Sequence, residues 1–245
     1  MNLLEVQGLR KTYPAFRLED VSFSVPEGAV MGLIGRNGAG KSTTLKSILG
    51  LVHPDAGRVE MFGREFSENE RYIKENIGVV LGGIDFYPKK KVRTITDVTR
   101  RFYSNWQEEK YRHYLDLFAI DENKRVDQLS SGMRVKYLLA LALSHNARLL
   151  ILDEPTSGLD PVSRDELTEL LRRIAADGTR SVLFSTHITS DLEKCASHIT
   201  FIQEGRLQRS DTLAGFIAHY ADLGSTLEEI IVAAERRPYD ADAII

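Results

Sequence analysis

The segment GRNGAGKST, from Gly35 to Thr43, places a lysine and a serine after glycines at the spacing of a phosphate-binding loop. Glycines let the backbone curl so that successive N–H groups point inward at phosphate oxygens. Lys41 adds a positive charge for the β- and γ-phosphates, and the Ser42 hydroxyl suits Mg²⁺. The alternative is a glycine-rich turn that matches by chance. The position between a buried strand and a helix favours the loop.

A second group of chemically active residues lies in LLILDEP, residues 149–155, where an apolar strand ends in two carboxylates. Ligands of open α/β sheets bind beyond the carboxyl ends of the strands. Asp153 is therefore placed to reach Mg²⁺ through a water, and Glu154 to orient or deprotonate an attacking water. His187 follows the strand SVLFST, and we expect it to contact the γ-phosphate. An ordinary acidic turn and a solvated histidine are the alternatives.

A third element is LSSGM, residues 129–133, which begins an apolar helical run. Small polar residues and a glycine at a helix start offer backbone N–H groups to an anion. The chain therefore has two possible anion-binding helix starts, far apart in sequence. Taken alone, LSSGM is more simply interpreted as an ordinary capped helix start.

The composition is that of an ordinary soluble, folded chain, with 245 residues, 42% apolar and 27% charged, and a net charge of −3. This charge balance gives no reason to expect sequence-independent binding to nucleic acid. A single cysteine, Cys195, excludes an internal disulfide and favours a reducing compartment. We expect neither a secretory signal nor a membrane span, so any membrane part must come from another chain.

The pattern of apolar residues predicts an α/β core that contains a helical insertion. Alternating antiparallel strands are expected first, then a buried strand that leads into the phosphate loop. From about 94 to 145 three helical patterns follow one another with no strand between them. The expected strands are 3–9, 21–25, 29–35, 58–63, 77–81, 148–153, 180–186 and 199–205. The expected helices are 42–51, 94–106, 108–120, 131–145, 161–178, 212–221 and 226–237.

The order of these motifs resembles that of the nucleotide-binding subunit of an ATP-binding cassette (ABC) transporter. GRNGAGKS resembles Walker A, LLILDE Walker B, LSSGM the family signature, SGLD the D-loop and STH the switch region. The resemblance covers residues 1–205. It implies a RecA-like P-loop NTPase core with an N-terminal antiparallel β layer and an inserted helical subdomain at about 94–145. Residues 206–245 are then a C-terminal helical extension and tail.

In the family, two subunits pack head to tail and each ATP lies between one phosphate loop and the other chain's signature. The resemblance implies catalytic roles for Glu154 and His187, and Mg²⁺ ligation by Ser42 and Asp153. Tyr13 is expected to stack on adenine, and Asp160 to order the opposite site. The implied loop contacts to ATP are Gly35, Arg36, Asn37, Gly38, Ala39, Gly40, Lys41, Ser42 and Thr43, and the implied contacts across the interface are Ser130, Ser131, Gly132 and Met133.

Two positions depart from the family pattern. A glutamine usually follows the strand that enters the helical subdomain, but here Gly82 or Gly83 stands at that place and Asp85 is the only polar candidate. The signature ends in Met133 rather than glutamine. The first departure leaves open how hydrolysis is coupled to a partner. The basic segment 87–93 is either a solvated face or a contact with a membrane partner or lipid headgroups.

The implied function is ATP binding and hydrolysis, with Mg²⁺, by a dimer that drives a transporter. The partners expected are a second copy or a related ABC subunit and a separate transmembrane permease, at the cytoplasmic face of the membrane. The chain looks most similar to ATPases of ABC-2-type exporters. The alternative is a soluble ABC-type ATPase that acts on the ribosome or nucleic acid, but the chain has one cassette and no sustained heptads. A P-loop kinase or GTPase would have no use for LSSGM.

Overall fold

A computed structural model of the chain describes residues 1–81 and 87–236. Within these residues the strands form one sheet in the order β5-β4-β1-β2-β10-β9-β3-β8-β7-β6. The strands are β1 (Asn2–Tyr13), β2 (Phe16–Pro26), β3 (Val30–Ile34), β4 (Ala56–Met61), β5 (Arg64–Glu65), β6 (Ile77–Leu81), β7 (Leu149–Asp153), β8 (Ser181–Thr186), β9 (His198–Gln203) and β10 (Arg206–Thr212). The helices are α1 (Lys41–Ile48), α2 (Phe66–Asn76), α3 (Val92–Thr99), α4 (Glu108–Leu117), α5 (Ser131–Ser144), α6 (Pro161–Ala175), α7 (Thr189–Cys195), α8 (Leu213–His219) and α9 (Leu227–Glu235).

The parallel part of the sheet aligns the strand ends that carry the chemistry. β3 pairs with β8 and β9, and β7 pairs with β6 and β8, all in parallel. Every residue of β3, β7 and β8 is buried, as expected for strands covered on both faces. Ile34 lies opposite Thr186, and Asp153 lies opposite Ser185. The phosphate loop, the acidic pair and His187 therefore leave the sheet at the same edge.

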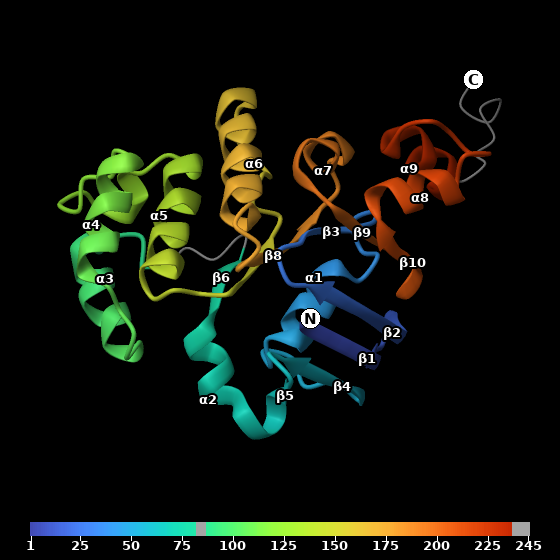
Figure 1. Ribbon diagram of the computed structural model, residues 1–245, viewed down its shortest axis with the longest axis horizontal. Coiled ribbons are helices and arrows are strands. Elements are labelled where there is room, and N and C mark those ends of the chain that lie inside the picture. Colours follow the sequence, from blue (N-terminus) through green and yellow to red (C-terminus); the bar gives the residue numbers. More distant parts are fainter. Residues whose placement is uncertain (82–86, 237–245) are drawn as a thin grey trace.

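The N-terminal strands form the antiparallel layer that the resemblance implies. β1 pairs antiparallel with β2 and with β4, and β4 pairs with β5 (Figure 1). β10 pairs antiparallel with β9 and meets β2 through Arg206 and Glu19, whose side chains also form an ion pair. Helix α1 packs between this layer and the parallel strands, with Leu45 and Ile48 fully buried. The observed fold agrees with the predicted P-loop NTPase architecture.

Helices α3, α4 and α5 lie together at one side of the molecule (Figure 1). They share a separate core that includes Val92, Ile95 and Leu115. Inside it the Thr96 hydroxyl bonds to the hydroxyls of Tyr111 and Tyr137 at 2.7 and 2.9 Å. Burial raises the pKa of Tyr111 to about 12 and also raises that of Tyr137. This group of helices occupies the chain segment in which three helices are expected, 94–145.

Four elements, α2, α7, β10 and the two-residue strand β5, differ from the expected pattern. Helix α2 was not predicted because it is polar almost all round, with only Ile73 buried and i,i+4 ion pairs such as Lys74–Glu70 on its surface. The short helix α7 was also missed. The segment 206–245, expected to be helical, begins with strand β10, whose residues are mostly polar. Within the described ranges no helix is long and apolar enough to cross a membrane.

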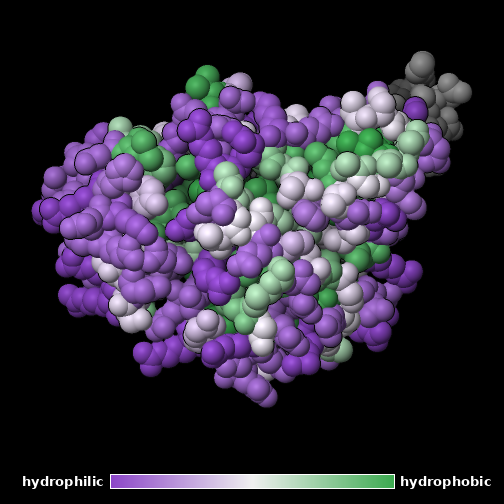
Figure 2. All heavy atoms as spheres, viewed as in Figure 1, coloured by the Kyte–Doolittle hydropathy of each residue, from purple (hydrophilic) through white to green (hydrophobic). Residues whose placement is uncertain are grey.

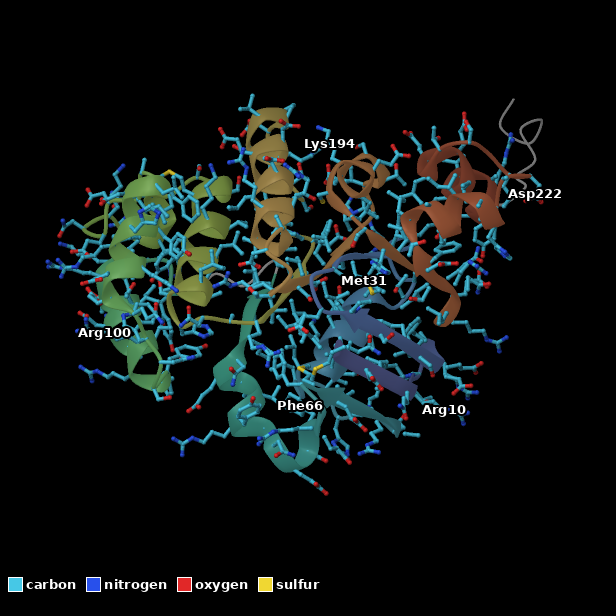
Figure 3. The ribbon with its side chains drawn as sticks, viewed as in Figure 1. Arg10, Met31, Phe66, Arg100, Lys194 and Asp222 are labelled. Carbon is cyan, nitrogen blue, oxygen red and sulfur yellow. The ribbon has the colours of Figure 1, made fainter. Side chains whose placement is uncertain are left out.

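The two C-terminal helices lie beside α7 (Figure 1). Hydrophobic residues gather over α8 and α9 on the face seen in Figure 2. On the inner side Phe216, Leu227 and Ile230 are fully buried in the same core as β3 and β8. In Figure 3, Lys194 of α7 lies on the side toward α6, and it pairs with Asp165 of that helix. The C-terminal helices are therefore packed onto the parallel part of the sheet.

Candidate active site

The phosphate-binding loop connects β3 to α1, as its sequence predicts. Gly38 and Gly40 have φ angles of 84° and 113°, in the left-handed region that favours glycine. A Cβ atom at Gly40 would also lie 2.9 Å from Cζ of Phe16. The first backbone hydrogen bond of α1 runs from the N–H of Thr44 to the carbonyl of Gly40, at 2.9 Å. The amides that precede Thr44 at the helix start have no acceptor within the helix, so they can bind an anion.

Lys41 is held at the inner side of this loop and is only 5% exposed. Its ammonium group donates to the carbonyls of Gly35 at 2.7 Å and Arg36 at 3.3 Å. It also lies 3.3 Å from Oε1 of Glu154. The positive charge that the loop sequence predicts is thus fixed between loop carbonyls and the acidic residue after β7.

Ser42 and Asp153, the predicted Mg²⁺ ligands, are in direct contact. The Ser42 hydroxyl donates to Oδ1 of Asp153 at 3.1 Å, and the Ser185 hydroxyl donates to the same oxygen at 2.6 Å. Across the described residues there is no group of three or more His, Cys, Asp or Glu that could hold a metal by itself. Mg²⁺ is usually held by one or two protein oxygens together with substrate phosphates and waters. This hydroxyl–carboxylate pair beside a phosphate loop fits that requirement.

Glu154 and His187, the predicted catalytic pair, also meet at this edge. Nδ1 of His187 lies 2.8 Å from Oε2 of Glu154. Glu154 has a φ of 49°, a strained value for a residue with a side chain. Its N–H donates to the hydroxyl of Ser185 at 2.9 Å and to the carbonyl of that residue at 3.1 Å. These two bonds hold the strained backbone that turns the carboxylate toward Lys41 and His187.

A hollow of about 580 Å³ lies beside the phosphate loop. Besides loop residues, its lining contains Ala15, Phe16, Glu154, Ser157 and His187. Sequence reasoning missed Phe16, Ser157 and the hydrogen-bonding role of Ser185. Phe16 begins β2 directly after the turn that follows the expected aromatic, Tyr13.

Tyr13 lies at the end of β1 and is 39% exposed. It pairs with Phe16 across the turn, and the Lys11 ammonium lies 5.9 Å from the centre of its ring. Tyr13 is not among the described residues that line the hollow beside the loop. Its stacking on adenine stays a prediction.

The signature residues begin helix α5. Ser130 caps the helix by accepting a hydrogen bond from the N–H of Met133 at 3.2 Å. Ser130 and Ser131 are exposed, whereas Gly132 is buried. A Cβ atom at Gly132 would approach the side chain of Ser163 in α6 to 3.2 Å, so glycine allows the two helix starts to lie close together.

Asp160 caps α6 in the same way and lies next to the signature. Its carboxylate accepts the N–H groups of Val162 and Ser163, each at 3.0 Å, and the Ser163 hydroxyl at 2.6 Å. The hydrogen bond from Ser163 is the main cause that lowers the pKa of Asp160. The signature and the predicted D-loop therefore form one surface, in which Ser131 also contacts the Gly158 carbonyl at 3.4 Å. None of the signature residues 130–133 is among the described residues that line the hollow beside the phosphate loop, whereas Ser157, the first residue of SGLD, lines it.

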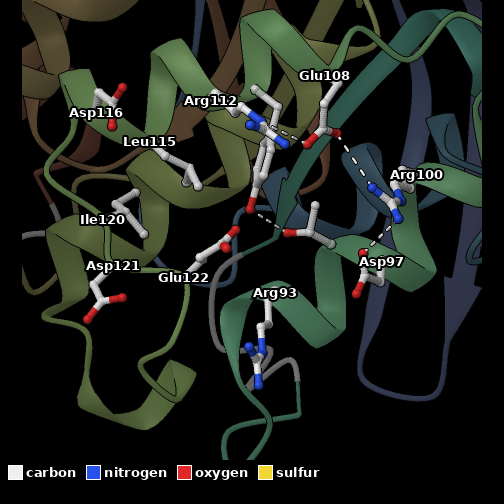
Figure 4. Close-up of a pocket in the computed structure, with 12 residues that line it drawn as sticks. Arg93, Asp97, Arg100, Glu108, Arg112, Leu115, Asp116, Ile120, Asp121 and Glu122 are labelled. Carbon is white, nitrogen blue, oxygen red and sulfur yellow. Dashed lines mark hydrogen bonds and ion pairs between the residues drawn. The ribbon is translucent and has the colours of Figure 1, made fainter.

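A separate hollow of about 550 Å³ lies among α3, α4 and the segment that follows α4 (Figure 4). Four of its charged residues form ion pairs: Glu108 pairs with Arg112 and Arg100 at 3.3 and 3.6 Å, and Arg100 pairs with Asp97 at 3.0 Å. The described lining contains three arginines and five carboxylates, so the hollow carries a net negative charge. We assign it no ligand.

Comparison with known proteins agrees with the P-loop ATPase that this fold and site define. A family model described as "ABC transporter" matches residues 18–157. The bacitracin transport ATP-binding protein BcrA of Bacillus licheniformis is 32% identical over 208 residues, which are 84% of this chain and 68% of that protein. The Nod factor export ATP-binding protein I of Burkholderia orbicola (strain AU 1054) is 39% identical over 191 residues, 76% of this chain and 62% of that protein. The chain thus spans about two thirds of the length of these relatives.

Solved structures give the same result. The ATP-binding subunit of an ABC transporter superposes with a TM-score of 0.84 at 28% identity, over 96% of this chain and 100% of that one. A dimeric ATP-binding cassette in a post-hydrolysis state with ADP and phosphate superposes with a TM-score of 0.74 at 21% identity, over 85% and 98% of the two chains, which shows a shared fold. The chain belongs to the ABC transporter family. Its biochemical activity is ATP binding and hydrolysis.

Proposed function

We propose that the chain is the ATP-hydrolysing subunit of a membrane exporter and that each ATP is bound between two chains. The observation that carries the proposal is the placement of Ser130 and Ser131. They are exposed at the start of the 14-residue helix α5, and they lie outside the described lining of their own chain's nucleotide hollow. An exposed helix start with two serine hydroxyls suits the γ-phosphate of an ATP held by a second chain. The second chain is a copy of this one or a related subunit.

The residues around the loop divide the chemistry among them. Lys41 and the amides at the start of α1 bind the phosphates, while Ser42 and Asp153 would hold Mg²⁺, which would neutralise phosphate charge. Glu154 accepts a proton from the attacking water, and His187 orients the Glu154 carboxylate and contacts the γ-phosphate. The contact between Lys41 and Glu154 keeps the base close to the site of phosphate binding.

The signature contacts only a nucleotide that carries a γ-phosphate, so hydrolysis weakens the contact between the chains. A dimer that closes on ATP and reopens on ADP converts this difference in affinity into movement. The names of the relatives, which concern bacitracin transport and Nod factor export, favour export through a membrane partner over action on the ribosome. We therefore place the chain at the cytoplasmic face of the membrane, bound to a separate permease.

The membrane assignment is tested by recovering the tagged chain from gently solubilised native membranes. We expect a multi-span membrane protein to remain bound at near-equal amounts. Recovery only with ribosomes, nucleic acid or soluble proteins would leave the ATPase chemistry intact and refute the export function.

Ser131→Arg is expected to prevent the dimer from closing without weakening ATP binding by the single chain. The large cation fills the space in which the partner's γ-phosphate would lie, so we expect ATP hydrolysis to fall by about 10²-fold. ATP affinity is measured by equilibrium titration and closure by light scattering with MgATP. Ser104→Arg, at an exposed position of the helical segment, is the matched control. If Ser131→Arg instead unfolds the chain, LSSGM has a structural role only.

A further inference from the structure

The last residue of α9, Glu235, contacts the start of the phosphate-binding loop although the two are 199 positions apart in sequence. The N–H of Arg36 donates to Oε1 of Glu235 at 3.1 Å, and Nε of Arg36 lies 3.5 Å from Oε2. The Glu235 side chain is only 6% exposed, whereas that of Arg36 is 60% exposed. A buried carboxylate is costly unless it is paired and hydrogen-bonded. The buried Glu235 carboxylate therefore favours the loop conformation in which Arg36 pairs with it.

The hydrogen bond from Arg36 acts on the same peptide unit that holds Lys41. In a trans peptide, the C=O of one residue and the N–H of the next point in opposite directions. The carbonyl of Gly35 accepts from the Lys41 ammonium at 2.7 Å, while the N–H of Arg36 donates to Glu235. One peptide plane is thus held between an ammonium group on one side and a carboxylate on the other. Both are charge-assisted hydrogen bonds, which are the stronger kind.

Helix α9 is itself anchored at both ends to elements of the site. At its start the N–H of Leu227 donates to Oε1 of Glu193 at 2.7 Å, in the helix α7 that follows His187. Near its end the side chain of Gln203 donates to the Ala234 carbonyl at 3.0 Å. Leu227 and Ile230 are fully buried between these contacts. Helix α9 therefore connects α7, which follows His187, with the phosphate loop.

We propose that Glu235 is a positioning residue that orients the Gly35–Arg36 peptide and, through it, Lys41, and that α9 links this loop to α7. Loop residues Arg36–Gly38 line the nucleotide hollow on one side and a second hollow, closed by Ala234, Glu235 and Arg236, on the other. A change in the packing of α9 would therefore alter the conformation of the loop from the side opposite the nucleotide hollow. By linkage, docking of α9 and binding of ATP favour each other by the same free energy.

The inference rests on the ATP-binding function and is tested by titrating purified chain variants with a fluorescent ATP analogue. Glu235→Leu removes both the acceptor and the charge, and we expect ATP affinity to fall about tenfold, the scale of one charge-assisted hydrogen bond. Glu235→Gln keeps an acceptor for the Arg36 amide and should regain most of that loss. Glu228→Gln, at an exposed position of the same helix, is the control and should bind like the unaltered chain.

Hydrogen exchange separates positioning from simple support of the fold. In the unaltered chain, ATP should slow exchange of the α9 amides, and in Glu235→Leu this protection should disappear. If Glu235→Leu lowers Tm but binds ATP like the control, or if ATP leaves α9 exchange unchanged, the proposal is refuted. If Glu235→Leu does not fold, Glu235→Ala, which also removes the acceptor and the charge, replaces it and must show the same loss of ATP affinity and of α9 protection. An unaltered chain that does not bind ATP would instead refute the nucleotide-binding function.

Discussion

Glu154→Gln is expected to slow ATP hydrolysis by about 10²–10⁴-fold while ATP binding is retained, the range for loss of a general base. Glutamine has nearly the same shape and can still accept a hydrogen bond from His187, but it cannot take a proton from water. The strained backbone at this position is held through the main chain by Ser185, so the substitution leaves its anchors in place. Turnover is measured under saturating MgATP, and ATP affinity by equilibrium titration.

The same variant should accumulate as a dimer in the presence of MgATP, because the closed dimer no longer hydrolyses its bound ATP. Light scattering with and without MgATP measures this directly. Glu70→Gln, which alters an exposed ion pair on α2, is the control for loss of a carboxylate and should turn over normally. Normal turnover by Glu154→Gln would remove the general-base role. A monomer at saturating MgATP would count strongly against a site shared by two chains.

Lys41→Ala is expected to weaken ATP binding by about 10²-fold, the combined scale of the charge-assisted hydrogen bonds that a buried ammonium makes. The side chain is almost fully buried, and its contacts join Gly35, Arg36 and Glu154. Its loss therefore removes both a charge for the phosphates and the anchor of the first loop peptide. Lys46→Ala is the matched control, since Lys46 is exposed in the last turn of the same helix. Equal ATP affinity of the two variants would exclude Lys41 from its assigned role.

The parallel core could be predicted from sequence because its strands are short apolar runs with clear ends. In β3 and β7 such a run is followed at once by the group that does chemistry, glycine in one case and a carboxylate in the other. The antiparallel pair β1–β2 was also predicted, from its alternating residues. β10 and α2 could not be, because their residues are mostly polar and neither has a clear apolar pattern.

The site could be predicted only where each residue of a contact lies in a sequence motif with an assigned role. The meeting of Ser42 with Asp153, and of Glu154 with His187, agrees with the motif assignments. Ser185, Phe16 and Glu235 act through tertiary contacts between distant segments, and no local pattern marks them. The expected glutamine position at Gly82 or Gly83, the candidate Asp85 and the tail 238–245 lie outside the described residues. Their roles stay predictions.

The most direct test of the account mixes two inactive chains. Lys41→Ala lacks a working phosphate loop and Ser131→Arg lacks a working signature, yet a mixed head-to-tail dimer contains one site with both parts intact. Half of randomly formed dimers are mixed, so we expect roughly a quarter of the unaltered ATPase activity, although each variant alone is inactive. If two folded variants recover no activity on mixing, the loop and the signature of different copies do not form one site, and the account is wrong.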